Sequence, residues 1–206
     1  MEITITQFLQ YLTFLAFISI FAVGINHLLL RFFKNLGVRR KDADATNVIR
    51  WAAQTKPAIG GFSFFLIFLL SIGFYLLSPF GSLENVDKAE FALLFSVSLG
   101  FFIGLVDDTY DLPPFFKFSG QLACAAIIIW SNLLIPLTGN FYMDAVATTF
   151  WVVMVMNAIN LLDNMDGITA SVSAFIVLAM FVVAVMLGNV SGFYAVVMLG
   201  TVGAMV

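Results

Sequence analysis

The sequence predicts an all-α protein that crosses a membrane about seven times. Of its 206 residues, 62% are hydrophobic and only 10% are charged, whereas a soluble domain carries roughly 25% charged residues. The mean hydropathy is +1.05. Apolar runs of about 20 residues, the length that spans a bilayer as a helix, recur along the whole chain. We therefore expect a polytopic helical membrane protein in which residues 1–206 belong to a single integral membrane domain.

Seven apolar segments account for the expected helices. They are residues 8–30, 59–77, 89–106, 118–134, 145–162, 168–187 and 191–206. The last segment has only 16 residues, fewer than the roughly 20 that a span needs. We therefore expect an incomplete seventh helix and a truncated sequence. Cys124 is the only cysteine and lies in an apolar run, which excludes disulfides and thiolate metal sites.

The positive charges predict the orientation of the chain in the membrane. Eight of the nine lysines and arginines fall in alternate loops or at their edges, and only Lys88 falls on the other side. Loops rich in lysine and arginine stay in the cytoplasm, so we expect the N-terminus outside. The residues that set this orientation are Arg31, Lys34, Arg39, Arg40, Lys41, Arg50, Lys56 and Lys117.

Three carboxylates gather where the third apolar segment ends. They belong to Asp107, Asp108 and Asp111, and the orientation above places them on the cytoplasmic face. A helix C-terminus carries partial negative charge, so a carboxylate there is unfavourable unless a cation compensates it. This cluster in a chain with few charges indicates a divalent metal or a phosphate-transfer site. Ordinary polar residues that end a membrane span would explain the stretch equally well.

A second polar cluster follows the same pattern at the end of the fifth apolar segment. Asn157, Asn160 and Asn164 are spaced for one face of a helix, and Asp163 and Asp166 lie beside them. Amides and carboxylates are costly in a bilayer unless they have partners. Hydrogen bonding between helices would explain Asn157 alone. It explains less well two asparagines followed by two aspartates on the same membrane side as the first cluster.

Residues that could bind an anion lie at the start of the second apolar segment. Lys56 precedes Pro57, which fits the first turn of a helix, and Gly60 and Gly61 follow. A helix N-terminus attracts anions, and glycines let a phosphate approach the backbone closely. Close packing against another helix explains the glycines equally well.

These three segments together carry a family resemblance. Residues 104–112 (GLVDDTYDL), 157–167 (NAINLLDNMDG) and 56–61 (KPAIGG) resemble motifs of the bacterial polyprenyl-phosphate N-acetylhexosamine-1-phosphate transferases. This is glycosyltransferase family 4, which includes the MraY and WecA types. The Asp-Asp-x-x-Asp-Leu pattern is more similar to the WecA branch, which uses UDP-N-acetylglucosamine. The MraY branch uses the UDP-muramoyl-pentapeptide and usually has a lysine near the third acidic position.

The resemblance implies an enzyme that transfers a sugar 1-phosphate, GlcNAc-1-phosphate for the WecA branch, from a UDP-sugar to undecaprenyl phosphate. The reaction would release UMP, require Mg²⁺ (with Mn²⁺ as a possible substitute) and start a cell-envelope glycan. The implied partners are the UDP-sugar, undecaprenyl phosphate, the lipid bilayer and a second copy in a homodimer, with no nucleic acid. The implied location is the bacterial inner membrane, with the active site facing the cytoplasm.

The resemblance also implies roles for individual residues. Asp107 and Asp108 would handle the acceptor phosphate, as a base or as part of the metal environment. Asp163 would be a catalytic or phosphate-site residue, and Asp108 and Asp163 would be metal ligands. The implied substrate-binding residues are Lys56, Asn157, Asn160 and Asp166.

Two departures from the family pattern qualify these expectations. Asn164 stands where the family usually has glycine. Family members also continue beyond the position of Val206 into a Gly-Asp-x-Gly-Ser loop, whose aspartate is a principal metal ligand. We therefore expect residues 1–206 to form the N-terminal part of a longer family domain and to be inactive alone.

Three other functions remain compatible with parts of the sequence. Within the family, the chain could be a phospho-MurNAc-pentapeptide transferase of peptidoglycan synthesis. An ion-coupled membrane transporter would also contain acidic residues, but near the middle of its spans rather than at helix ends. A membrane scaffold would require no acidic cluster at all.

Overall fold

The computed structural model describes residues 5–35, 60–77, 86–110, 112–162, 167–188 and 190–205, and it is all-helical there. Five of its helices are long and apolar enough to cross a membrane, and α4 and α7 are shorter apolar helices. The predicted all-α membrane fold with seven helices is thus confirmed. The helices are α1 (Ile5–Asn35), α2 (Gly60–Leu77), α3 (Lys88–Tyr110), α4 (Pro114–Trp130), α5 (Phe141–Leu162), α6 (Ile168–Met186) and α7 (Gly192–Met205).

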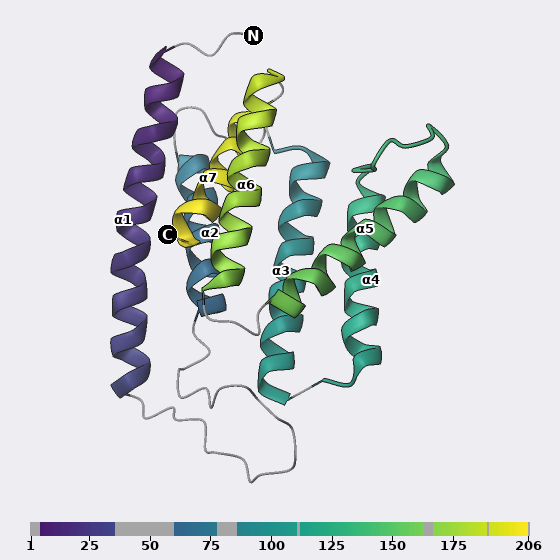
Figure 1. Ribbon diagram of the computed structural model, residues 1–206, viewed down its shortest axis with the longest axis horizontal. Helices are drawn as coiled ribbons and strands as arrows, with labels where there is room; N and C mark the ends of the chain where they lie inside the picture. The colour runs from purple at the N-terminus through teal and green to yellow at the C-terminus, as the bar shows by residue number, and fades with distance from the viewer. Residues whose placement is uncertain are drawn as a thin grey trace.

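The helices form two neighbouring groups (Figure 1). In one group, α7 packs against α1, α2 and α6; in the other, α4 packs against both α3 and α5. Successive helices run in alternating directions, so α3 ends and α4 begins at the lower end in Figure 1. Helix α5 runs obliquely from the upper end of α4 toward the start of α6. Asp107 and Asp108 of the first acidic cluster therefore lie at one end of the bundle, where α3 ends and α4 begins.

Helix α7 occupies the interior of its group and is mostly buried, with Phe193 and Leu199 almost inaccessible. Its glycines allow this close approach. A Cβ atom at Gly200 would collide with the side chain of Ser71 on α2, and one at Gly203 would collide with Ile18 on α1. Small residues at helix contacts are typical of membrane proteins, where helices associate through close packing rather than through the hydrophobic effect.

The observed helix ends differ from the predicted ones around the first acidic motif. Helix α3 extends to Tyr110 rather than to residue 106, so the two adjacent aspartates lie in its last turn. Helix α4 begins at Pro114 rather than at residue 118, so Lys117 lies in its first turn. The reason is that Pro114, which lacks an N–H, suits the first helical position, where no intrahelical partner exists for one. These shifts bring Lys117 close to the end of α3.

The opposite end of α3 begins with a reciprocal capping arrangement. Oδ1 of Asp87 accepts a hydrogen bond from the Glu90 N–H at 2.7 Å, and Oε2 of Glu90 accepts one from the Asp87 N–H at 3.3 Å. This capping box satisfies backbone donors that a helix start would otherwise leave unpaired. It explains why α3 begins at Lys88, one residue before the predicted start.

The turn between α4 and α5 is fixed by Asp144 and Asn140. Asp144 accepts hydrogen bonds from the backbone N–H groups of Leu137, Thr138 and Gly139 and from the Thr138 hydroxyl. Asn140 Oδ1 accepts from the first N–H groups of α5. This cap explains why α5 begins at Phe141 instead of at residue 145.

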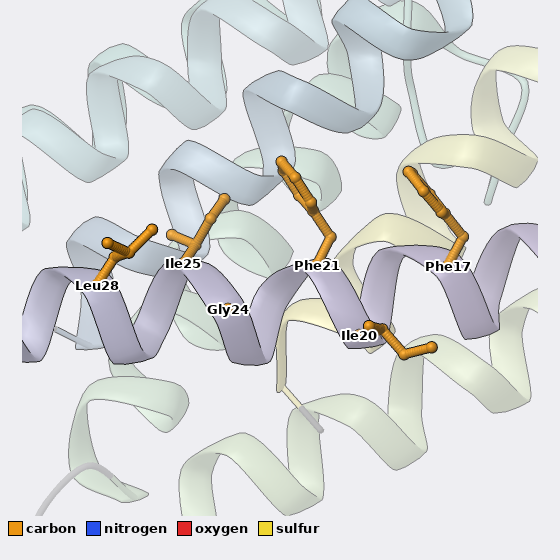
Figure 2. Close-up of a pocket in the computed structure, with 6 residues that line it drawn as sticks. All are labelled: Phe17, Ile20, Phe21, Gly24, Ile25 and Leu28. Atoms are coloured by element: carbon orange, nitrogen blue, oxygen red, sulfur yellow. The ribbon is translucent and has the colours of Figure 1, made fainter.

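A shallow hollow lies along α1, away from the acidic motif (Figure 2). In this view, Phe17 and Phe21 rise from one side of the helix and Ile20 from the other, while Gly24 leaves a gap before Leu28. All the lining side chains are apolar. A phosphate needs hydrogen-bond donors or cations, so this hollow is not suited to phosphate chemistry.

Candidate functional site

The best-defined part of the site is an ion pair between α3 and α4. Nζ of Lys117 lies 2.8 Å from Oδ2 of Asp107, with the two side chains 33% and 19% exposed. Oδ1 of Asp107 accepts a hydrogen bond from the backbone N–H of Leu112 at 3.1 Å. Both oxygens of this carboxylate are therefore engaged. The cation that a carboxylate at a helix C-terminus requires is here supplied by the protein itself.

Asp108 is in a different environment, although it is the next residue. Its side chain is exposed, and a substrate phosphate or a metal ion could reach it from the end of the bundle. Thr109 is also exposed, but its hydroxyl donates to the Leu105 carbonyl within the helix at 2.7 Å. Of the two adjacent aspartates, Asp108 is thus the more exposed to solvent.

The asparagines of α5 do not all behave alike. Nδ2 of Asn157 donates to Oε1 of Gln121 on α4 at 2.9 Å and to the Val153 carbonyl at 2.8 Å. This is the interhelical hydrogen bond that the sequence allowed as an alternative to substrate binding by Asn157. Asn157 and Asn160 are both exposed, and a role for Asn160 in binding substrate stays a prediction.

Several predicted site residues lie outside the described part of the structure. These are Lys56, Asp111, Asp163, Asn164 and Asp166. The helix ends that flank them are described: α2 begins at Gly60, α5 ends at Leu162 and α6 begins at Ile168. The roles of these residues therefore remain predictions from the sequence.

The described residues fit a metal site only in part. Among them, no group of three or more histidine, cysteine, aspartate or glutamate side chains could enclose an ion. Mg²⁺, however, is usually held by one or two carboxylates together with waters and substrate phosphates. An exposed carboxylate such as that of Asp108 fits this chemistry.

Sequence reasoning missed two residues that organise this region, Lys117 and Gln121. Their spacing in the sequence could have indicated a shared role, because residues four apart lie on the same face of a helix. What the sequence did not show is that this face contacts both neighbouring helices. Lys117 pairs with the acidic end of α3, and Gln121 pairs with α5 one turn further along.

Comparison with known proteins adds an independent line of evidence. The chain is 34% identical over 94 residues to a decaprenyl-phosphate N-acetylglucosaminephosphotransferase of Mycolicibacterium smegmatis, covering 40% of this chain and 23% of the relative. It is 29% identical over 164 residues to a phospho-N-acetylmuramoyl-pentapeptide-transferase of Desulfitobacterium hafniense, covering 68% and 46%. A probable undecaprenyl-phosphate N-acetylglucosaminyl 1-phosphate transferase of Bacillus subtilis is 35% identical over 91 residues, covering 38% and 25%.

These alignments cover less than half of each of these relatives. No solved structure matches the chain. Residues 90–206, more than half of the chain, match the sequence profile described as glycosyl transferase family 4. The matched region includes Asp107, Asp108, Lys117, Gln121 and Asn157. This multi-pass membrane protein therefore belongs to glycosyl transferase family 4.

Proposed function

We propose that the protein transfers GlcNAc-1-phosphate from UDP-GlcNAc to undecaprenyl phosphate and releases UMP, which starts a cell-envelope glycan. The observation that carries this proposal is the acidic end of α3, where Asp108 is exposed next to the Asp107–Lys117 pair. This arrangement lies inside the family match. Two of the relatives reported above are named as enzymes that act on a polyprenyl phosphate and an N-acetylglucosamine phosphate group.

The reaction joins two anionic groups and therefore needs charge neutralisation. An oxygen of the lipid phosphate forms a bond to the phosphorus nearer the sugar, and the bond from that phosphorus to UMP breaks. Mg²⁺, or Mn²⁺ in its place, would neutralise the phosphate oxygens when bound. Asp108, with Asp163 from the second motif, would hold the ion. Asp107 and Asp108 would act on the acceptor phosphate, as a base or as part of the metal environment. Asp163 would be a further catalytic or phosphate-site residue.

The remaining predicted residues are proposed to bind the UDP-sugar donor. Lys56 and Asp166 would lie near the nucleotide, and Asn160 would orient Asp163 or a phosphate. The basic loops support a site facing the cytoplasm in the bacterial inner membrane, where a soluble UDP-sugar and a lipid headgroup can meet. A homodimer would be compatible with this arrangement.

One alignment supports testing a second sugar donor as well. The relative that covers the largest share of this chain among those reported above is named as a phospho-N-acetylmuramoyl-pentapeptide-transferase. The experiment therefore gives the purified full-length protein undecaprenyl phosphate, Mg²⁺ and either UDP-GlcNAc or UDP-MurNAc-pentapeptide. Release of UMP with UDP-GlcNAc supports the proposal. Release only with the pentapeptide donor assigns the other branch, and release with neither donor contradicts both.

A further inference from the structure

Helix α4 makes polar contacts with two different helices from successive turns. Lys117 reaches Asp107 on α3, with 2.8 Å between Nζ and Oδ2. Gln121, one turn later, accepts a hydrogen bond from Asn157 on α5, with 2.9 Å between Oε1 and Nδ2. One helix face thus connects to the helix that ends in the first motif and to the helix that leads into the second.

Helix α4 is also held firmly against α3 by other contacts. The Ser96 hydroxyl donates to the Cys124 carbonyl at 3.2 Å, and the Cys124 thiol donates to the Ser96 carbonyl at 3.5 Å. Gly120 lies so close to Ile103 that a Cβ atom there would force the isoleucine to move. Helix α4 and the acidic end of α3 therefore form one unit.

Direct contact between α3 and α5 is slight by comparison. Within the described helices, α4 packs extensively against both α3 and α5, whereas α3 and α5 share few close approaches. One approach is at Gly100, where the methyl group of Met156 is 3.6 Å from the position that a Cβ atom would take. The placement of α5 relative to Asp107 and Asp108 therefore depends mainly on its contacts with α4.

The hydrogen bond between Gln121 and Asn157 has a defined direction. Nδ2 of Asn157 is the donor and Oε1 of Gln121 the acceptor, and the same Nδ2 also donates to the Val153 carbonyl one turn earlier. Gln121 is only 9% exposed. Asn157 on the other side of the bond is exposed. Leaving the largely buried Gln121 side chain without its donor is unfavourable.

From this geometry we infer that Gln121 is a positioning residue: through Asn157 it fixes α5 relative to the acidic end of α3. The inference rests on the function proposed above, in which residues of both motifs act on the same pair of phosphates. Asn157 then acts through Gln121 instead of on the substrate. A displacement of about 1 Å between reacting groups can lower a rate on the order of 100-fold, so loss of this bond lowers kcat more than it raises KM.

The test compares removal of the hydrogen bond with an exchange of its partners in the full-length protein. Gln121→Leu removes the acceptor, and Gln121→Asn shortens the side chain that carries it. The double variant Gln121→Asn with Asn157→Gln keeps the total length of the pair and its hydrogen-bonding groups. Leu122→Met, on an exposed part of the same helix, is the matched control. UMP release gives kcat and KM for each variant.

A distance measurement provides a readout that does not depend on activity. In a background in which Cys124 and any further cysteine of the full-length protein are replaced by alanine, nitroxide labels are placed at Phe102 on α3 and Leu161 on α5, both exposed. Pulsed electron paramagnetic resonance then reports the separation of the two helices. Gln121→Leu is expected to shift or broaden this distance distribution and to lower kcat on the order of 10- to 100-fold. The exchanged pair is expected to recover both properties, and Leu122→Met to change neither.

Two results would overturn the inference. One is an unchanged distance distribution with unchanged kcat in Gln121→Leu, or in Gln121→Asn if the leucine variant does not fold. The other is an exchanged pair that regains the wild-type distances without regaining kcat, since Asn157 would then act on the substrate directly. If the wild type releases no UMP with either donor, the proposed function fails, and the distances alone still decide whether Gln121 positions α5.

Discussion

Lys117 and Asp107 form an ion pair of 2.8 Å that joins the first turn of α4 to the last turn of α3. It supplies the positive charge that a carboxylate at a helix C-terminus needs. From the sequence, this need for a compensating cation indicated a metal ion beside Asp107, Asp108 and Asp111. Lys117 meets this need for Asp107, so the ion pair joins Asp107 to α4. Asp108, the next residue, is the more exposed of the two aspartates.

Replacing Lys117 by methionine should lower activity far more than stability. A partly exposed ion pair contributes at most about 1 kcal/mol to the free energy of unfolding. The lost charge also stands beside the site proposed for two phosphates, so we expect kcat/KM to fall at least about 10-fold. Thermal unfolding in detergent and UMP release measure the two effects. Lys117→Arg keeps the charge, and equal activity in wild type and Lys117→Met would contradict the prediction.

Asp108→Asn should abolish most activity while leaving the fold intact. Its side chain is exposed, and polar interactions of exposed carboxylates contribute at most about 1 kcal/mol to the free energy of unfolding. A neutral amide is a poorer Mg²⁺ ligand and a poor base, so we expect UMP release to fall about 100-fold or more. Thr109→Ser, which keeps the hydroxyl bonded to Leu105, is the neighbouring control. Near-normal turnover by Asp108→Asn would remove Asp108 from the site.

The glycines of α7 provide a prediction about stability. Gly203→Ala places a Cβ atom against Ile18, close to the backbone of Ser19, and such overpacking costs typically about 1–3 kcal/mol. Gly73→Ala in α2 meets no atom within 4 Å and should be neutral or slightly stabilising, because alanine favours helix. Melting temperatures of the two variants test this contrast. Equal melting temperatures would mean that α7 does not pack as described.

Asp144 should matter for folding but not for catalysis. Its carboxylate binds three backbone N–H groups of the α4–α5 turn, at the end of α5 opposite to the second motif. Asp144→Ala should lower the melting temperature, and Asp144→Asn should lower it less because one oxygen acceptor remains. The activity per folded molecule should stay at the wild-type level in both variants. A selective loss of kcat without a change in melting temperature would contradict this assignment.

The helical class and most helix positions were predictable because they follow from long apolar runs, which depend on the chain alone. The starts of α4 and α5 were missed by four residues, since Pro114 and the Asn140 cap extend these helices beyond the apolar runs. Asp107 and Asp108 were correctly placed at the end of α3. The partners of its residues were not predictable, because the contacts of Lys117 with Asp107 and of Gln121 with Asn157 depend on how three helices pack.

The measurement that tests the central claim most directly is Mg²⁺-dependent UMP release by the purified full-length protein, with UDP-GlcNAc and undecaprenyl phosphate as substrates. The account predicts release by the wild type that stops when Mg²⁺ is chelated, and release by Asp108→Asn that is lower by about 100-fold or more. No release from the folded wild type with any UDP-sugar, or undiminished release from Asp108→Asn, would contradict it.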